Sequence, residues 1–136
     1  MWSEWKRASM RTMAALGYAA ALSSTASAAY ISADLVQAGA HTWDVNFTVS
    51  ADPGQVVEAF TVYFDWTQVS NLQVWGTPLD WDSLVIQADS ALMADGFFDT
   101  LALANGIVDP KALGGFIARF DWADDSGPTG FRYTVN

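Results

Sequence analysis

The chain has 136 residues, a formal net charge of −9 and no cysteine. The absence of cysteine excludes disulfides, cysteine metal sites and a lipidated cysteine anchor. An acidic surface repels nucleic-acid phosphates and anionic lipid headgroups, so we expect no nucleic-acid partner.

The first 28 residues have the pattern of a Sec-type secretory signal peptide. Lys6, Arg7 and Arg11 precede an apolar run from Met13 to Leu22, and small residues follow as far as residue 28. We predict cleavage after residue 28 and a protein that is secreted or held at the cell surface. The apolar run is much shorter than the roughly 20 residues of a membrane-spanning helix, so no stable membrane span is expected in the mature chain.

Removal of this segment changes the charge balance of the chain. Residues 1–28 contain one of the 15 acidic side chains and three of the six basic side chains. Residues 29–136 therefore contain 14 acidic and three basic side chains, which gives a formal charge of −11. The remaining 108 residues suit a single domain that buries about two thirds of its surface on folding. Without disulfides, its stability must come from apolar packing or from bound ions.

Alternating apolar residues predict strands through the first half of the domain. Residues 30–35 are expected to form an edge strand, and residues 42–50 alternate strictly, with Trp43, Val45 and Phe47 on one side. A turn at 52–54 leads to a second alternating run over 57–66, in which Trp66 continues the inward phase. We expect the runs 42–50 and 57–66 to be neighbours in a hairpin.

The second half continues in the same way. Residues 72–75, 83–88, 116–122 and 131–135 are predicted strands, the last of them a second edge that, like 30–35, could extend a partner's sheet. Residues 96–104 fit neither period cleanly, and their shortness favours a strand over a helix. These elements predict an all-β fold, an antiparallel immunoglobulin-like β-sandwich over residues 29–136. Its predicted core is Trp43, Val45, Phe47, Phe60, Val62, Phe64, Leu101, Phe116 and Phe120.

One short pattern occurs twice in this domain. Residues 59–66 read AFTVYFDW, and 56 positions later residues 115–122 read GFIARFDW. Because alternate rings face one way in both copies, we interpret them as comparable central strands whose rings fill the space between two sheets. A paired functional use of Asp65 and Asp121 is the less favoured alternative.

An ordered series of motifs resembles secreted bacterial proteins of the PEP-CTERM sorting-domain type. The motifs are FTVYFD (60–65), NLQV (71–74), DWD (80–82), DGFFD (95–99) and LGGF (113–116), and the likeness extends from Trp43 to Phe131. The resemblance implies a β-sandwich exported by a Gram-negative bacterium, associated with the extracellular matrix or cell surface and without established enzymatic activity. This sequence ends at Asn136 and contains no Val-Pro-Glu-Pro motif, basic tail or C-terminal hydrophobic segment of that family.

Two sets of residues are candidate binding sites. Asp80, Asp82, Asp95 and Asp99 lie at strand ends and are calcium candidates, because calcium takes six to eight oxygen ligands. None matches the twelve-residue calcium loop, and turns or solvated loops explain them equally well. Tyr63, Trp75 and Trp81 are candidates for stacking on an extracellular polysaccharide, although large rings in small domains more often fill the core.

Enzymatic readings have the weakest support. His41 is the only histidine, no Gly-x-Ser-x-Gly motif is present, and a glycosidase-like carboxylate pair is expected by chance among so many aspartates. We therefore expect a non-catalytic exported module with a structural or interaction role in the bacterial envelope or matrix. A carbohydrate-binding or calcium-binding adhesion module is the alternative, and a glycan-active enzyme is less favoured. The expected partners are an extracellular polysaccharide or an envelope protein. We expect no cofactor, with calcium as the one alternative.

Overall fold

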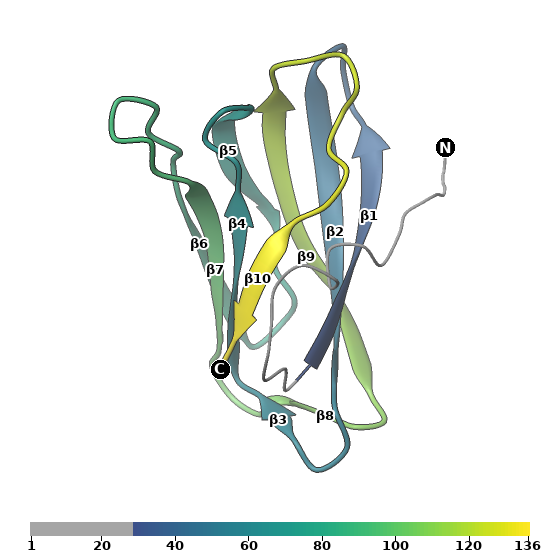
Figure 1. Cartoon of the computed structure of the whole chain (residues 1–136). Coiled ribbons are helices and arrows are strands. Elements are labelled where there is room, and N and C mark those ends of the chain that lie inside the picture. The colour runs from purple at the N-terminus through teal and green to yellow at the C-terminus, as the bar shows by residue number, and fades with distance from the viewer. Residues whose placement is uncertain (1–28) are drawn as a thin grey trace.

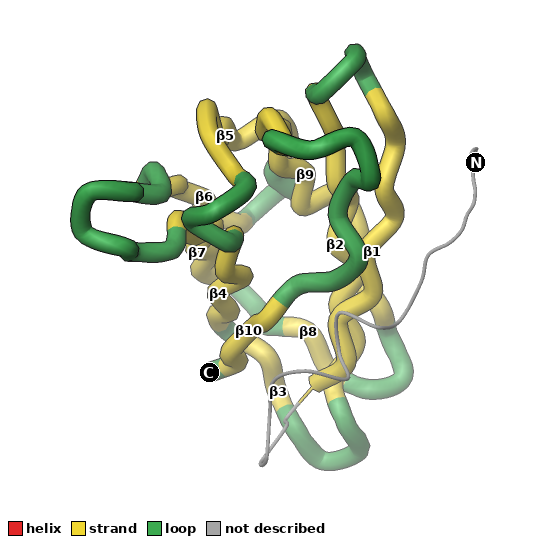
Figure 2. The backbone as a smooth tube through the Cα atoms, turned by 45° about the horizontal axis from the view of Figure 1, so that its top comes forward, coloured by secondary structure: helices red, strands yellow, loops and turns green. Residues whose placement is uncertain are grey.

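The computed structural model describes residues 29–136, so the predicted signal peptide lies outside the described residues (Figure 1). The described chain consists of strands and loops, as Figure 2 shows, and contains no helix that could cross a bilayer. The strands are β1 (Ala29–Gln37), β2 (Thr42–Ala51), β3 (Val56–Val57), β4 (Ala59–Phe64), β5 (Val69–Gly76), β6 (Trp81–Ile86), β7 (Gly96–Ala102), β8 (Ile107–Val108), β9 (Ala112–Trp122) and β10 (Arg132–Val135). The prediction of an all-β fold for residues 29–136 is confirmed.

Two four-stranded sheets make up most of the domain. The first sheet has the order β1-β2-β9-β5 and the second has the order β10-β4-β7-β6, and every pairing is antiparallel. Figure 1 shows the two sheets facing each other. β1 and β10 are edge strands of their sheets, as predicted from the sequence.

The expected hairpin between residues 42–50 and 57–66 is wrong. β2 pairs with β1 and β9, whereas β4 pairs with β7 and β10, so the chain crosses from one sheet to the other between them. The physical reason is that alternation shows which face of a strand is buried but does not show which other strand pairs with it. The second run is also broken at Glu58 into β3 and β4, and Trp66 lies in the turn after β4, half-buried.

Inward-facing side chains of both sheets form one core. Val45, Phe47, Phe60, Phe116 and Phe120 are fully buried, as the alternation predicts. The remaining members of the predicted core are Val62 and Phe64, which are buried, Trp43, which is half-buried and packs against the core, and Leu101.

The placement of Leu101 in the core is wrong. Its side chain is 54% exposed, and the inward positions of β7 are taken by Phe98 and Thr100. Thr100 can occupy a buried place because its hydroxyl donates to the carbonyl oxygen of Asp82 at 2.9 Å. A polar residue in the inward phase thus concealed the strand's true alternation.

The two FDW segments form β4 and most of β9, which are central strands of opposite sheets. Equivalent rings meet across the core: Phe60 lies 4.9 Å from Phe116, edge to face, and Phe64 lies 5.2 Å from Phe120. The interpretation of the repeat as two central strands is confirmed, and the strands face each other directly.

A small two-stranded sheet of β3 and β8 lies at one end of the domain. It pairs Val57 with Ile107, both of them buried, and so extends the core beyond the two main sheets. A Cβ atom on Gly106, just before β8, would lie 2.5 Å from the carbonyl oxygen of Val57, so only glycine fits this close approach. This arrangement shapes the pocket described next.

Candidate functional site

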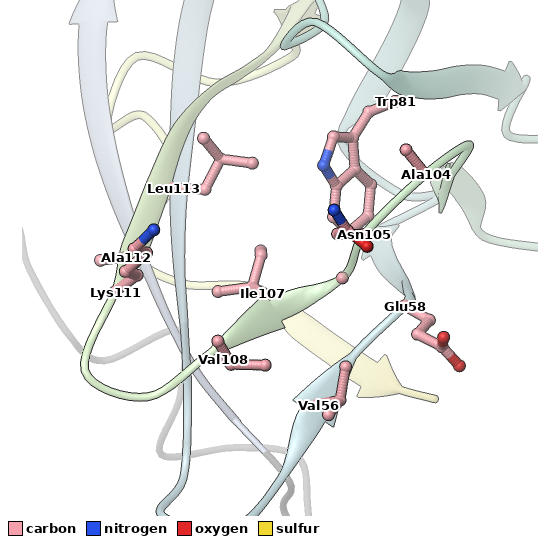
Figure 3. Close-up of a pocket in the computed structure, with 11 residues that line it drawn as sticks. Val56, Glu58, Trp81, Ala104, Asn105, Ile107, Val108, Lys111, Ala112 and Leu113 are labelled. Atoms are coloured by element: carbon pink, nitrogen blue, oxygen red, sulfur yellow. The ribbon is translucent and has the colours of Figure 1, made fainter.

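A pocket of about 600 Å³ lies beside the β3–β8 sheet (Figure 3). Its walls come from β3, the segment before β8, the β8–β9 turn and the start of β6. The lining residues are Val56, Glu58, Trp81, Ala104, Asn105, Gly106, Ile107, Val108, Lys111, Ala112 and Leu113. Most of this lining is apolar, and the volume is within the range of small-molecule sites.

Trp81 forms an inner wall of the pocket and is only 7% exposed, which corrects its prediction as a surface ring for sugar stacking. Its ring packs against Phe60 and Phe116, at centroid distances of 6.4 and 5.1 Å. The sequence predicted this strand only from residue 83, but β6 begins at Trp81 and directs its side chain inward. The indole nitrogen faces the pocket in Figure 3, and no group in residues 29–136 accepts a hydrogen bond from it.

Three polar side chains accompany the apolar lining. Asn105 stands beside the Trp81 ring, Lys111 lies at the β9 side of the mouth, and Glu58 lies at the β3 side with its carboxylate turned outward (Figure 3). Lys111 is the only lysine in residues 29–136, and it forms no ion pair within this part of the chain. The pocket therefore offers hydrogen-bond donors and one positive charge beside apolar walls, with the one carboxylate, that of Glu58, turned away from it.

The four calcium candidates do not come together. Asp80 and Asp82 lie at the start of β6, near the end of β7, whereas Asp95 precedes β7 at the opposite end of that hairpin. Asp99 lies between them on β7, where it accepts a 2.7 Å hydrogen bond from the Thr61 hydroxyl. Within residues 29–136 no three His, Asp or Glu side chains form a metal-binding group.

Asp95 instead joins a network with two other elements. It accepts a 3.0 Å hydrogen bond from the backbone nitrogen of Trp66 and pairs with Arg132 at 2.8 Å. The Arg132 guanidinium lies 4.4 Å from the centre of the Tyr63 ring, which is half-buried on the outer face of β4. One candidate sugar-binding ring is thus partly covered by a cation, and one candidate calcium ligand is engaged by it.

Trp75, the third candidate ring, lies on β5 with 53% of its surface exposed. The Arg119 guanidinium lies 3.9 Å from its ring centre and is held by two hydrogen bonds to the Asp44 carboxylate, at 2.7 and 2.8 Å. The same hydrogen bonds raise the pKa of Arg119 above its ordinary value, so the cation is permanent. The outer face of the first sheet therefore presents an exposed indole in a fixed position.

The outer face of the second sheet carries a group of apolar side chains. Ile86 on β6 lies opposite Phe97 on β7, which lies opposite Tyr63 on β4, so one row of side chains crosses three strands. Leu84 and Leu101 extend this row along β6 and β7, and the exposed fractions of Leu84, Ile86 and Leu101 are 48%, 49% and 54%. We call these five residues the apolar face. Asp82 and Asp99 lie among them on the same strands.

His41 lies away from the pocket, immediately before β2. Its Nδ1 is 3.1 Å from the Trp122 carbonyl oxygen and its Nε2 is 3.6 Å from the Asp125 carboxylate. The nearby Asp124 accepts hydrogen bonds from the hydroxyl and backbone nitrogen of Ser126, and these lower the pKa of Asp124. These contacts organise a loop at the end of β9.

Comparison with known proteins identifies no relative. No protein-family model, no curated protein and no solved structure matches this chain.

Sequence reasoning missed both the pocket and the apolar face. The pocket combines residues from four separate segments, and no local motif marks it. The apolar face did leave a signal, since Leu84, Val85 and Ile86 are consecutive apolar residues. In a strand, such a run places apolar side chains on both faces.

Proposed function

We propose that this protein is an exported, non-catalytic interaction module of a bacterial envelope or matrix. The observation that carries the proposal is the apolar face, because grouped apolar side chains with polar neighbours on a domain surface are a common feature of interaction sites. With a formal charge of −11 on residues 29–136, and with Asp82 and Asp99 among the apolar side chains, the surface suits an envelope protein with a basic, partly apolar face.

For the fold class, we propose an immunoglobulin-like sandwich in the broad architectural sense. Two facing antiparallel sheets and an aromatic core support it. The strand order is a departure from the constant-type immunoglobulin order. There the fifth strand lies between the second and the fourth, whereas here β9, the last strand but one, lies between β2 and β5.

The signal-peptide pattern of residues 1–28 and the resemblance to PEP-CTERM-type proteins support a location outside the cytoplasm. N-terminal sequencing of the protein recovered from a secreting host tests the export step. We expect the mature chain to begin at Ala29 or within a residue or two. A folded extracellular product that retains residues 1–28 would contradict it.

Substitution of the apolar face tests the interaction. Leu84→Lys with Ile86→Lys should release the protein from the envelope fraction, because two charges would be buried against the partner. The matched control is Tyr30→Lys with Val36→Lys, which changes two similarly exposed side chains on the first sheet. Equal retention of both double variants, with unchanged melting temperatures, would contradict the proposal.

A second candidate function is carbohydrate binding through Trp75. The supporting observation is its half-exposed indole, held by Arg119 and Asp44 on a polar sheet face. A polysaccharide panel should quench tryptophan fluorescence, and Trp75→Ala should abolish the response while Tyr30→Ala leaves it intact. Quenching that survives in Trp75→Ala would exclude this residue as the site.

Calcium-dependent adhesion has less support, because the four candidate aspartates are separated and Asp95 is paired with Arg132. Millimolar calcium would raise the melting temperature of a calcium-binding domain through mass action, and a chelator would lower it. An unchanged melting temperature in both conditions would remove this alternative.

A further inference from the structure

The pocket beside β3 and β8 is a separate feature from both outer faces of the sheets. Apolar side chains from β3, β8 and β9 line it, including Val56, Ile107 and Leu113. Burial of an apolar group in such a space is favourable in proportion to the area removed from water. The lining alone therefore indicates a ligand with an apolar body. The polar groups of the pocket indicate which chemical group the ligand carries at its other end.

The Trp81 indole N–H is the first of these polar groups. Trp81 is more than nine-tenths buried, its nitrogen faces the pocket, and residues 29–136 supply no acceptor for it. The nitrogen itself is reached by water through the pocket, because Gln68 Oε1 is the one fully buried side-chain polar atom without a partner among residues 29–136. A ligand that displaces this water loses affinity unless it presents an acceptor oxygen to the nitrogen.

Lys111 indicates the charge of that acceptor. Residues 29–136 carry 14 carboxylates, yet their one lysine has no ion-pair partner among them and lies at the mouth of the pocket. The side-chain amide of Asn105 adds another donor on the Trp81 side (Figure 3). A carboxylate can accept hydrogen bonds from several donors at once and is neutralised by an ammonium group.

We propose that this pocket binds a small carboxylate with an apolar body. The carboxylate end accepts from the Trp81 N–H and is neutralised by Lys111, while the aliphatic part packs on Val56, Ile107 and Leu113. A free short-chain acid and the carboxy-terminus of an apolar peptide share this chemistry. The site is independent of the interaction proposed for the apolar face.

Titrations with three ligands that share one aliphatic chain test the chemistry. Hexanoate, hexanamide and hexylamine would be added to the purified protein, and the Trp81 indole N–H signal would be followed by NMR. We expect hexanoate to move that signal downfield, hexanamide to bind more weakly and hexylamine not to bind. No shift with hexanoate, or equal binding of the amine, would overturn the proposal.

Variants then test the named residues. Lys111→Met should weaken hexanoate binding roughly tenfold, the effect of losing a charge-assisted hydrogen bond, whereas Lys111→Arg should retain binding. Ala104→Phe should fill the pocket and abolish binding, and Ala91→Phe, at an exposed loop position outside the pocket, is its control. Ala104 is exposed, so its replacement keeps the core intact where Trp81→Phe could unfold it. Unchanged hexanoate affinity in Lys111→Met or in Ala104→Phe would refute the assignment.

A comparison with peptides distinguishes the two possible sources of the carboxylate. A leucine-ending tripeptide with a free carboxy-terminus would be compared with its amidated form and with hexanoate. Tighter binding of the free peptide identifies a chain terminus as the ligand, and tighter binding of hexanoate identifies a small acid. Equal binding of the free and amidated peptides would contradict carboxylate recognition.

Discussion

The two FDW segments pack in the same way on their inward faces but differ in structure where they end. On the inward side, Phe60 meets Phe116 and Phe64 meets Phe120 across the core. At the ends they diverge, because β4 stops at Phe64 and leaves its Asp-Trp pair in a turn, whereas β9 continues through Trp122. The rings are alike because both strands fill the same space between sheets.

The aspartates of the two segments show this divergence most clearly. Asp65 accepts hydrogen bonds from the backbone nitrogen and the hydroxyl of Thr67, at 2.9 and 2.7 Å, and so closes a local turn. Asp121 accepts a 2.8 Å hydrogen bond from the hydroxyl of Thr42 on the neighbouring strand. The repeat is therefore architectural in its rings, and its polar residues serve separate local purposes.

The largest expected effect comes from removing one ring of each segment. Phe64→Ala and Phe120→Ala should each lower the free energy of unfolding by about 3–5 kcal/mol, because both rings are fully buried. Urea unfolding of the two variants measures the losses. A loss below about 1 kcal/mol in only one of them would show that the two segments are not equivalent in the core.

The contact between the segments can be measured directly. A double-mutant cycle on Phe60 and Phe116 should give a coupling of about 0.5–1.5 kcal/mol, the range of aromatic pairs. Phe60 with Phe120 is the control pair, since the structure records no ring contact between them. Equal coupling in the two cycles would mean that no specific Phe60–Phe116 interaction exists.

The two aspartates should respond to different partners. Asp65→Ala and Asp121→Ala should each cost about 1 kcal/mol, the net value of ordinary hydrogen bonds. Thr67→Ala should be non-additive with Asp65→Ala and additive with Asp121→Ala, and thermal unfolding of the single and double variants checks this. Non-additivity between Thr67 and Asp121 would contradict the separation of the two roles.

The smallest expected effect concerns the loop that follows the second segment, where Trp122 donates its indole N–H to Asp124 at 3.0 Å. Hydrogen bonds from Ser126 lower the folded-state pKa of Asp124, so its contribution to stability is present above the unfolded value of about 3.9 and is lost as the pH falls through the folded value. The wild type should thus melt slightly above Asp124→Asn at pH 7, and the gap should close under strong acid. A difference in melting temperature between the two proteins that does not change with pH would contradict the predicted dependence of stability on the ionisation of Asp124.

The sequence by itself determined the strand character of the chain and most of its core. Strict alternation in residues 42–50 and in the two FDW segments identified the buried Val45, Phe47 and Phe64, because every second side chain of a strand faces the same way. It also predicted accessible rings at Tyr63, Trp75 and Trp81, of which the first two lie on outer faces and the third is buried. These are consequences of local geometry, which the order of residues alone specifies.

Tertiary structure decided the partners of each strand and the location of the pocket. β2 and β4 lie in different sheets, Leu101 faces out because the satisfied Thr100 takes the inward position, and Trp81 is enclosed by rings from β4 and β9. The pocket exists only because β3, β6, β8 and β9 meet at one end of the domain. The position of these strands depends on which strands pair with each other, and the paired strands are far apart in the sequence. Alternation within one strand carries no information about which strand pairs with it.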